Sequence, residues 1–188
     1  MKLFKDKTVR YAAGVILLMG LYTLILGTTC HLKYHHLAYD DFDLAVHTQS
    51  LRSILMGSAE SSILGIPFLG NHMVLILYLI APLYALFPSA VLLLYIQTIA
   101  LAAGAWAIYR IAQRELSPAW GLSLAAAYVI YPPLIYLNLY EFHPIALAST
   151  FILFAMLHWK ENAFGRFLLM LALAASCQEN IALLAIGF

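Results

Sequence analysis

Three aspartates within four positions, Asp40, Asp41 and Asp43, are the side chains best suited to chemistry. Only 10% of the residues are charged and 64% are hydrophobic, so a cluster of carboxylates is unusual in this chain. A carboxylate at the desolvated edge of a membrane holds a proton more readily, which suits it to proton abstraction from a sugar or lipid hydroxyl. We therefore predict that Asp43 or Asp41 acts as a catalytic base. Alternatively, Asp43 caps a following helix and the other two are solvated loop charges.

A second candidate site lies in the short segment Tyr140-Glu141-Phe142-His143-Pro144. Pro144 suits the first turn of a helix, so Glu141 and His143 would be held in a tight turn near the membrane surface. We predict that Glu141 is a further catalytic carboxylate and that His143 binds substrate. Asp43, Glu141 and His143 are also the candidate ligands if the site holds a divalent metal. The alternative is an ordinary polar turn within an aromatic belt.

Glu179 lies about 11 residues into an apolar run, near the middle of a membrane at 1.5 Å per residue. A carboxylate at that depth is costly unless it faces a polar cavity or a partner. His72 lies two residues after Gly70, which lets the backbone bend, and it is either a donor to a phosphate or simply a polar group at the interface. The predicted substrate-binding residues are His72, Arg52, His143, Glu179 and Gln49.

The composition predicts an all-α integral membrane protein rather than a soluble domain, in which roughly 45–50% of residues would be apolar. The mean hydropathy is +0.88. A net charge of +1 argues against nucleic acid as a partner, since that role needs a basic face. The lipid bilayer is the expected partner. Five apolar segments are predicted to cross it: Tyr11–Thr29, Ala90–Ile108, Trp120–Leu137, Pro144–Leu157 and Phe167–Phe188.

Two other segments are predicted to lie at the membrane surface. Residues Asp43–Met56 have apolar side chains at near-helical spacing, which indicates an amphipathic helix ended by Gly57. The apolar segment Met73–Phe87 is short and contains Pro82, which favours an interfacial or re-entrant helix. If Met73–Phe87 does not cross, eight of the ten Lys and Arg residues lie on the cytoplasmic side, as the positive-inside rule requires. We therefore expect a multi-pass inner-membrane protein with a cytoplasmic N-terminus.

Residues 1–188 are expected to form one transmembrane module. Because the chain ends inside an apolar run, we expect it to be the N-terminal part of a longer protein.

The order and spacing of several short motifs resemble an uncharacterised bacterial family of multi-spanning predicted membrane proteins. That family's pattern reads D-L-x-x-x-x-Q, G-D-H, P-L-Y, F-H-P and K-E-D. Asn71 replaces the acidic residue of G-D-H, and Gln178 and Asn180 replace the flanks of K-E-D. The matching positions are Asp43-Leu44 with Gln49, Gly70-Asn71-His72, Pro82-Leu83-Tyr84, Gln97, Phe142-His143-Pro144 and Gln178-Glu179-Asn180.

That family is similar in plan to the GT-C glycosyltransferases, which use a sugar on a polyprenyl phosphate. The resemblance implies that the first external loop carries the catalytic aspartate, matched by Asp43 or Asp41. It implies a further acidic motif in the second external loop, matched by Glu141. On this hypothesis Arg52 and His72 approach the lipid-linked phosphate. The alternatives are a transporter or lipid-handling protein in which Glu179 is a proton or substrate site, and a truncated, non-catalytic fragment.

Overall fold

A computed structural model describes residues 2–39 and 42–185 of the chain, and the protein is 79% helical. The prediction of an all-α protein is confirmed, apart from one two-stranded hairpin in which Glu60 pairs with Pro67 and Ser61 with Ile66. The elements are α1 (Lys2–His35), α2 (Asp43–Leu55), β1 (Glu60–Ser61), β2 (Ile66–Pro67), α3 (Phe68–Asn71), α4 (Ile76–Leu86), α5 (Ala90–Glu115), α6 (Pro118–Val129), α7 (Pro132–Tyr140), α8 (Pro144–Lys160), α9 (Phe164–Ala175) and α10 (Glu179–Ala185).

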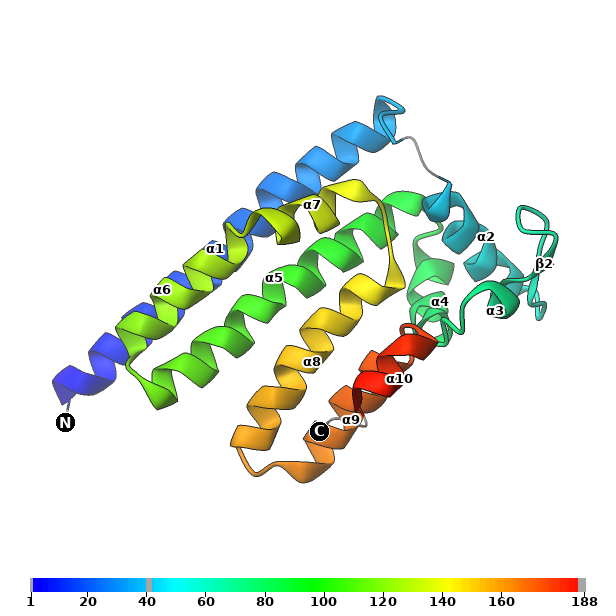
Figure 1. Ribbon diagram of the computed structural model, residues 1–188. Helices are drawn as coiled ribbons and strands as arrows, with labels where there is room; N and C mark the ends of the chain where they lie inside the picture. Colours follow the sequence, from blue (N-terminus) through cyan, green and yellow to red (C-terminus); the bar gives the residue numbers. More distant parts are fainter. Residues whose placement is uncertain (1, 40–41, 186–188) are drawn as a thin grey trace.

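The long helices run side by side and reverse direction at the two ends of a bundle (Figure 1). At one end lie the start of α1, the α5–α6 connection and the α8–α9 connection. We call it the arginine end, because Arg110, Arg114 and Arg166 belong to it. At the other end lie the α7–α8 connection, the α9–α10 connection and a cap made of α2, the hairpin, α3 and α4. We call this the histidine end, after His47, His72 and His143.

Two helices are long and apolar enough to cross a membrane, within Thr8–His35 of α1 and over Ala90–Glu115 of α5. A third span is formed if α6 and α7 are counted together. The five predicted spans are therefore not confirmed, because α8 and α9 have 17 and 12 residues and fall below the length of a full crossing.

The predicted helix Trp120–Leu137 is broken into α6 and α7, which meet at an angle of 45°. Pro132 and Pro133 occupy the first turn of α7. Proline lacks the N–H that would continue the α6 ladder and clashes with the preceding turn, so the helix bends at this pair.

The predicted span Phe167–Phe188 is also interrupted. Helix α9 ends at Ala175, the chain turns through Ser176–Gln178, and α10 begins at Glu179. In Figure 1, α10 lies beside the upper part of α9 rather than extending it. Glu179 is therefore the first residue of α10 at the histidine end, not halfway along a span.

The cap agrees closely with the sequence-based prediction. Helix α2 begins at Asp43 and ends at Leu55, and Gly57 follows it with φ of +72°. Helix α4 has 11 residues, about 16 Å of helix, which is too short to cross a bilayer. It packs against α2 at the histidine end, through buried side chains that include Leu77 and Tyr84.

Helices α1, α5 and α6 are in close contact with one another. A Cβ added at Gly121 of α6 would lie 3.0 Å from the backbone oxygen of Tyr109 on α5. Only glycine allows this approach without moving the backbone. Val15 of α1, Ala105 of α5 and Ala125 of α6 are fully buried in the same cluster, so α1, α5 and α6 pack against one another.

Candidate functional site

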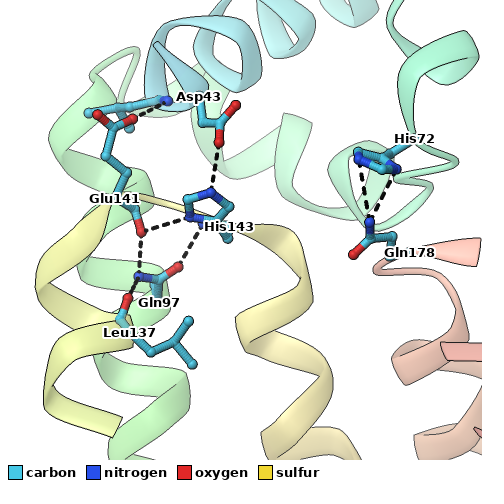
Figure 2. A network of polar contacts seen from close by, with 8 residues as sticks. Asp43, His72, Gln97, Leu137, Glu141, His143 and Gln178 are labelled. Atoms are coloured by element: carbon cyan, nitrogen blue, oxygen red, sulfur yellow. Dashed lines mark hydrogen bonds and ion pairs between the residues drawn. The ribbon is translucent and has the colours of Figure 1, made fainter. Parts of the chain in front are cut away.

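A carboxylate–imidazole pair lies at the histidine end of the bundle. Asp43 Oδ2 is 2.7 Å from His143 Nε2, joining the first residue of α2 to the residue before α8 (Figure 2). The side chains are 34% and 23% exposed, so the pair is partly shielded but can be reached from solvent. His143 Nδ1 lies 3.4 Å from the carbonyl oxygen of Glu141, and its ring stacks on Tyr140. Both ring nitrogens therefore lie near oxygen acceptors.

Gln97 of α5 holds this turn in place. Its Nε2 donates to the backbone oxygen of Glu141 at 2.7 Å and to that of Leu137 at 3.3 Å. Its Oε1 accepts from the backbone N–H of His143 at 2.8 Å. Gln97 has no exposed surface, so these bonds form away from water. One buried amide thus fixes the backbone on both sides of Phe142.

Glu141 connects the same turn to the start of α2. Its Oε2 accepts from the backbone N–H of Leu44 at 2.7 Å, and the residue is 1% exposed. The first N–H groups of a helix lack partners within the helix and carry a partial positive charge, so a carboxylate stabilises them. Asp43 itself makes no side-chain cap, and the residue that precedes the helix is Phe42. The capping role considered for Asp43 is thus filled by Glu141 from a distant part of the chain.

Helix α1 supports the turn from the other side. Lys33 Nζ donates to the backbone oxygen of Leu139 at 2.7 Å, near the end of α7. Asn138 is fully buried and accepts from the hydroxyl of Thr98 at 3.0 Å. The connection that carries Glu141 and His143 is therefore held by α1, α2 and α5 together.

His47 lies one turn after Asp43 on α2. Its Nδ1 is buried and has no hydrogen-bond partner among the described residues. The ring meets Phe142 edge-on, with centroids 5.6 Å apart. Burial lowers the pKa of His47 from 6.5 to about 4; the Asp43 carboxylate opposes this shift, and His143 and His72 add to it. His47 is therefore neutral at neutral pH.

His72, Gln178 and Glu179 join the cap to the α9–α10 connection. His72 Nδ1 lies 2.9 Å from Glu179 Oε1, and the Gln178 amide lies 3.1 Å from the same ring nitrogen. Glu179 Oε2 also accepts from the backbone N–H of Met73 at 2.9 Å. The hydrogen bond to His72, followed by the backbone hydrogen bonds, lowers the pKa of Glu179 to about 2. We refer to His72, Met73, Gln178 and Glu179 as the clasp.

A polar cavity of about 110 Å³ lies between the carboxylate–imidazole pair and the clasp. In Figure 2, His72 and Gln178 face this region from one side, and Asp43 and His143 face it from the other. Four segments of the chain meet at it: α2, the α3–α4 connection, the start of α8 and the α9–α10 connection. Its lining residues are Asp43, Val46, His47, Asn71, His72, Val74, His143, Pro144, Ile145, Cys177 and Gln178.

Arg52 and Gln49, the other predicted substrate-binding residues, lie on the opposite face of α2. They line a separate cavity of about 510 Å³. The Gln49 amide is already bound to the hairpin, since Oε1 accepts from Ser61 at 2.7 Å and Nε2 donates to Ser62. The structure thus brings Asp43, His72 and His143 to one cavity and leaves Arg52 and Gln49 at another.

The candidate metal ligands do not form one group. Within residues 2–39 and 42–185, no three His, Cys, Asp or Glu side chains are close enough together to hold a metal ion. The Glu141 carboxylate points to α2 rather than to the contact between Asp43 and His143. Asp41 lies outside the described residues. The catalytic role of Glu141 stays a prediction. In the structure its carboxylate accepts a hydrogen bond from Leu44 and so helps to position the start of α2.

The sequence analysis includes Gln97 only as a position that matches the family pattern, and it assigns no role to His47. Gln97 is a lone amide in the apolar segment Ala90–Ile108, and an uncharged polar residue at such a depth is the signal that could have found it. His47 follows Asp43 by four residues and so shares its helix face, but only the fold shows what packs against it.

Comparison with known proteins places the chain in a family. The family described as predicted membrane protein (DUF2079) matches residues 33–188. Because this match covers most of the sequence, the chain belongs to that family, and the family-level resemblance is confirmed. No curated protein and no solved structure shows significant similarity to the chain.

Proposed function

We propose that this DUF2079 membrane protein is a GT-C-like glycosyltransferase module that takes a sugar from a polyprenyl-phosphate donor. The observation that carries the proposal is the 2.7 Å contact between Asp43 Oδ2 and His143 Nε2 beside a polar cavity. A carboxylate oriented by an imidazole can accept a proton from a hydroxyl. Imidazole, amide and carboxylate groups also line the cavity, and these groups hydrogen-bond to sugar hydroxyls.

In the proposed reaction, the acceptor's hydroxyl oxygen forms a bond to the anomeric carbon of the donor. The bond from that carbon to the phosphate oxygen breaks, and its electron pair leaves with the polyprenyl phosphate. The acceptor's proton passes to the Asp43 carboxylate, while His143 Nε2–H keeps that carboxylate in position. No step of this scheme requires a metal.

The remaining residues of the site have positioning roles in this proposal. Gln97 and Glu141 connect α5, the turn and α2, so they fix the distance between Asp43 and His143. Catalysis is sensitive to such distances, because a shift of about 1 Å can cost about a hundredfold in rate. Glu141 thus acts through Asp43 rather than on substrate.

We also propose that the histidine end is extracytoplasmic and that the N-terminus is cytoplasmic, in a bacterial inner membrane. The support is the gathering of Arg110, Arg114, Lys160 and Arg166 at the arginine end. Labelling of full-length protein in intact cells tests this orientation. A cysteine introduced at Ser62 should react with an impermeant thiol reagent, and one introduced at Asn162 should not.

Transfer of a radiolabelled sugar from a polyprenyl-phosphate donor in membranes of the full-length protein tests the base assignment. Asp43→Asn should lower transfer by about a hundredfold, the usual contribution of a positioned proton acceptor. Glu115→Gln is the matched control, since this exposed carboxylate pairs with Lys160 at the opposite end. Equal transfer by wild type and Asp43→Asn would remove Asp43 as the base.

A transporter remains the alternative class, with Glu179 as its proton or substrate site. Its motivation was a carboxylate deep within a span. Glu179 instead begins α10, directly after a turn, and its oxygens are bound by His72 and the backbone N–H of Met73. This placement favours the transferase proposal. A pH-driven flux in vesicles that Glu179→Gln abolishes, without sugar transfer, would favour the transporter.

A further inference from the structure

Helix α2 separates two cavities of different character. Asp43, Val46 and His47 face the small polar cavity described above. The larger cavity, of about 510 Å³, lies between the other face of α2, the end of α1 and the start of α5. It is lined by Tyr34, Leu37, Tyr39, Leu44, Ala45, Thr48, Gln49, Arg52 and Ala90.

Arg52 supplies the positive charge of the larger cavity. Among the described residues its side chain contacts no carboxylate, and its Nε donates to the hydroxyl of Tyr84 at 3.4 Å. At the arginine end the situation differs, because Arg110, Arg114 and Arg166 all contact Glu161. The Arg52 guanidinium is therefore available to an external anion, and its planar set of donors suits a phosphate.

The other walls of the cavity suit the apolar part of a lipid. Leu37, Leu44, Ala45 and Ala90 contribute apolar surface, while the polar groups of Thr48 and Gln49 are already bonded within the protein. A charged residue at one side of a cavity with both apolar and polar walls is compatible with an amphiphile that has an anionic headgroup. A freely soluble anion would use the arginine and leave the apolar walls uncovered.

The position of Arg52 separates this ligand from the proposed reaction. Arg52 follows Asp43 by nine residues, about 14 Å along the helix axis, and lies on the other face of α2. In a sugar phosphate, the phosphate oxygen is bonded directly to the anomeric carbon that reacts. A phosphate held by Arg52 is therefore too far from Asp43 to belong to the bond that breaks.

We infer that the larger cavity binds the phosphate headgroup of a membrane lipid through Arg52, on the opposite face of α2 from the Asp43–His143 pair. This inference does not depend on glycosyl transfer. The lipid would occupy the space between α1, α2 and α5 and so support α2, whose first residue is Asp43.

Native mass spectrometry of the full-length protein, released from nanodiscs of defined composition, tests the inference. Three probes are added separately: phosphatidylglycerol, a polyprenyl monophosphate and inorganic phosphate. Arg52→Gln should reduce retention of at least one lipid about tenfold, the effect of losing one charge-assisted hydrogen bond. Arg52→Lys should keep most of the binding. The lipid that responds identifies whether the ligand is a bilayer phospholipid or a polyprenyl phosphate.

Two further variants distinguish a loss of lipid binding from a general effect on folding. Ala45→Trp fills the cavity without removing charge and should reduce lipid retention as Arg52→Gln does. Arg166→Gln removes a charge at the arginine end and should retain lipid as the wild type does. Retention of both lipids at the wild-type level by Arg52→Gln and Ala45→Trp would overturn the inference. So would binding of inorganic phosphate alone, with no difference for either lipid.

Discussion

Two glutamates with little exposed surface lie at opposite ends of the bundle, and their carboxylates have different partners. At the arginine end, Glu161 follows α8 and its side chain is 11% exposed. It lies 3.0 Å from Arg110, 2.9 Å from Arg114, 3.1 Å from His158 and 3.8 Å from Arg166. The arginine side chains are between 32% and 63% exposed, so the cluster is open to water and salt on its outer side.

At the histidine end, one oxygen of the Glu141 carboxylate is bonded to the backbone. Its carboxylate accepts from the N–H of Leu44, at the positive end of the α2 dipole. Its own carbonyl accepts from Gln97. Both hydrogen bonds are buried and 2.7 Å long. Each involves a backbone atom, which cannot move as freely as a long arginine side chain.

The difference indicates a division of labour between the two ends. An exposed ion cluster stabilises weakly and tolerates small movements, which suits a surface that meets lipid headgroups. A buried hydrogen bond to the backbone fixes one geometry. This suits an end where Asp43 and His143 must stay within hydrogen-bonding distance. The comparison predicts that substitutions at the histidine end lower the free energy of unfolding strongly and by the same amount at any salt concentration. Substitutions at the arginine end should lower it less, and the loss should depend on salt.

The largest effect is expected for Glu141→Ala. This change leaves the buried N–H of Leu44 without the carboxylate and should lower the free energy of unfolding by about 3 kcal/mol. Thermal unfolding in detergent would measure it, at low and high salt. Glu115→Ala, an exposed carboxylate, is the control and should change stability little. A loss for Glu141→Ala that disappears in high salt would contradict the comparison.

The second prediction concerns Gln97→Leu. Leucine has a similar size but leaves the N–H of His143 and the carbonyl of Glu141 without partners, so we expect a loss of about 2 kcal/mol. Sugar transfer should also fall, because the turn that carries His143 is no longer fixed. Gln113→Leu on the same helix, α5, is the matched control. If the two variants unfold at the same temperature, the hydrogen bonds of Gln97 to the turn do not stabilise the protein.

The cap could be predicted from the sequence to a large extent, whereas the site could be predicted only in part. Apolar spacing and Gly57 defined α2, and the short length of Met73–Phe87 indicated a helix that does not cross. These are local signals, so a single segment contains them. The partner of the Leu44 N–H is 97 residues away in the chain, at Glu141, and no local pattern encodes that contact.

The two broken helices teach a different lesson. Pro132-Pro133 was a readable signal for the bend between α6 and α7, but continuous hydrophobicity favoured one span. The break before Glu179 has no proline. It depends on contacts with the cap, such as the hydrogen bond from the Ile76 N–H to the Ser176 oxygen at 2.8 Å. Hydropathy reports how apolar a segment is, not where it turns.

A third prediction distinguishes the two ends by pH. Because the pKa of His47 is about 4 in the fold and 6.5 in the unfolded chain, the unfolded state binds more protons between these values. Stability should therefore fall as pH drops from 6.5 to 4, by about 1.5 kcal/mol after allowance for partial exposure. Chemical denaturation of wild type and His47→Asn across this range would measure it. His36→Gln is the control, and an unchanged slope in His47→Asn would refute the assignment.

The smallest effect is expected for Glu161→Gln. Burial raises the pKa of Glu161, but the hydrogen bond to His158 and the charges of Arg114 and Arg110 outweigh it and lower the pKa overall. Stability from this group is thus fully present above pH 4.5 and is lost as pH falls through the lowered pKa. At neutral pH, Glu161→Gln should cost about 1 kcal/mol, because the arginines are partly exposed and screened.

Salt decides whether this cluster differs from the histidine end as the comparison requires. The Debye length falls from about 10 Å at 0.1 M salt to about 3 Å at 1 M, so the difference between wild type and Glu161→Gln should shrink over that range. Denaturant unfolding at the two salt concentrations would measure it, with Glu141→Gln as the matched variant. A Glu161→Gln difference that persists unchanged in 1 M salt would show that both glutamates are held by short-range contacts.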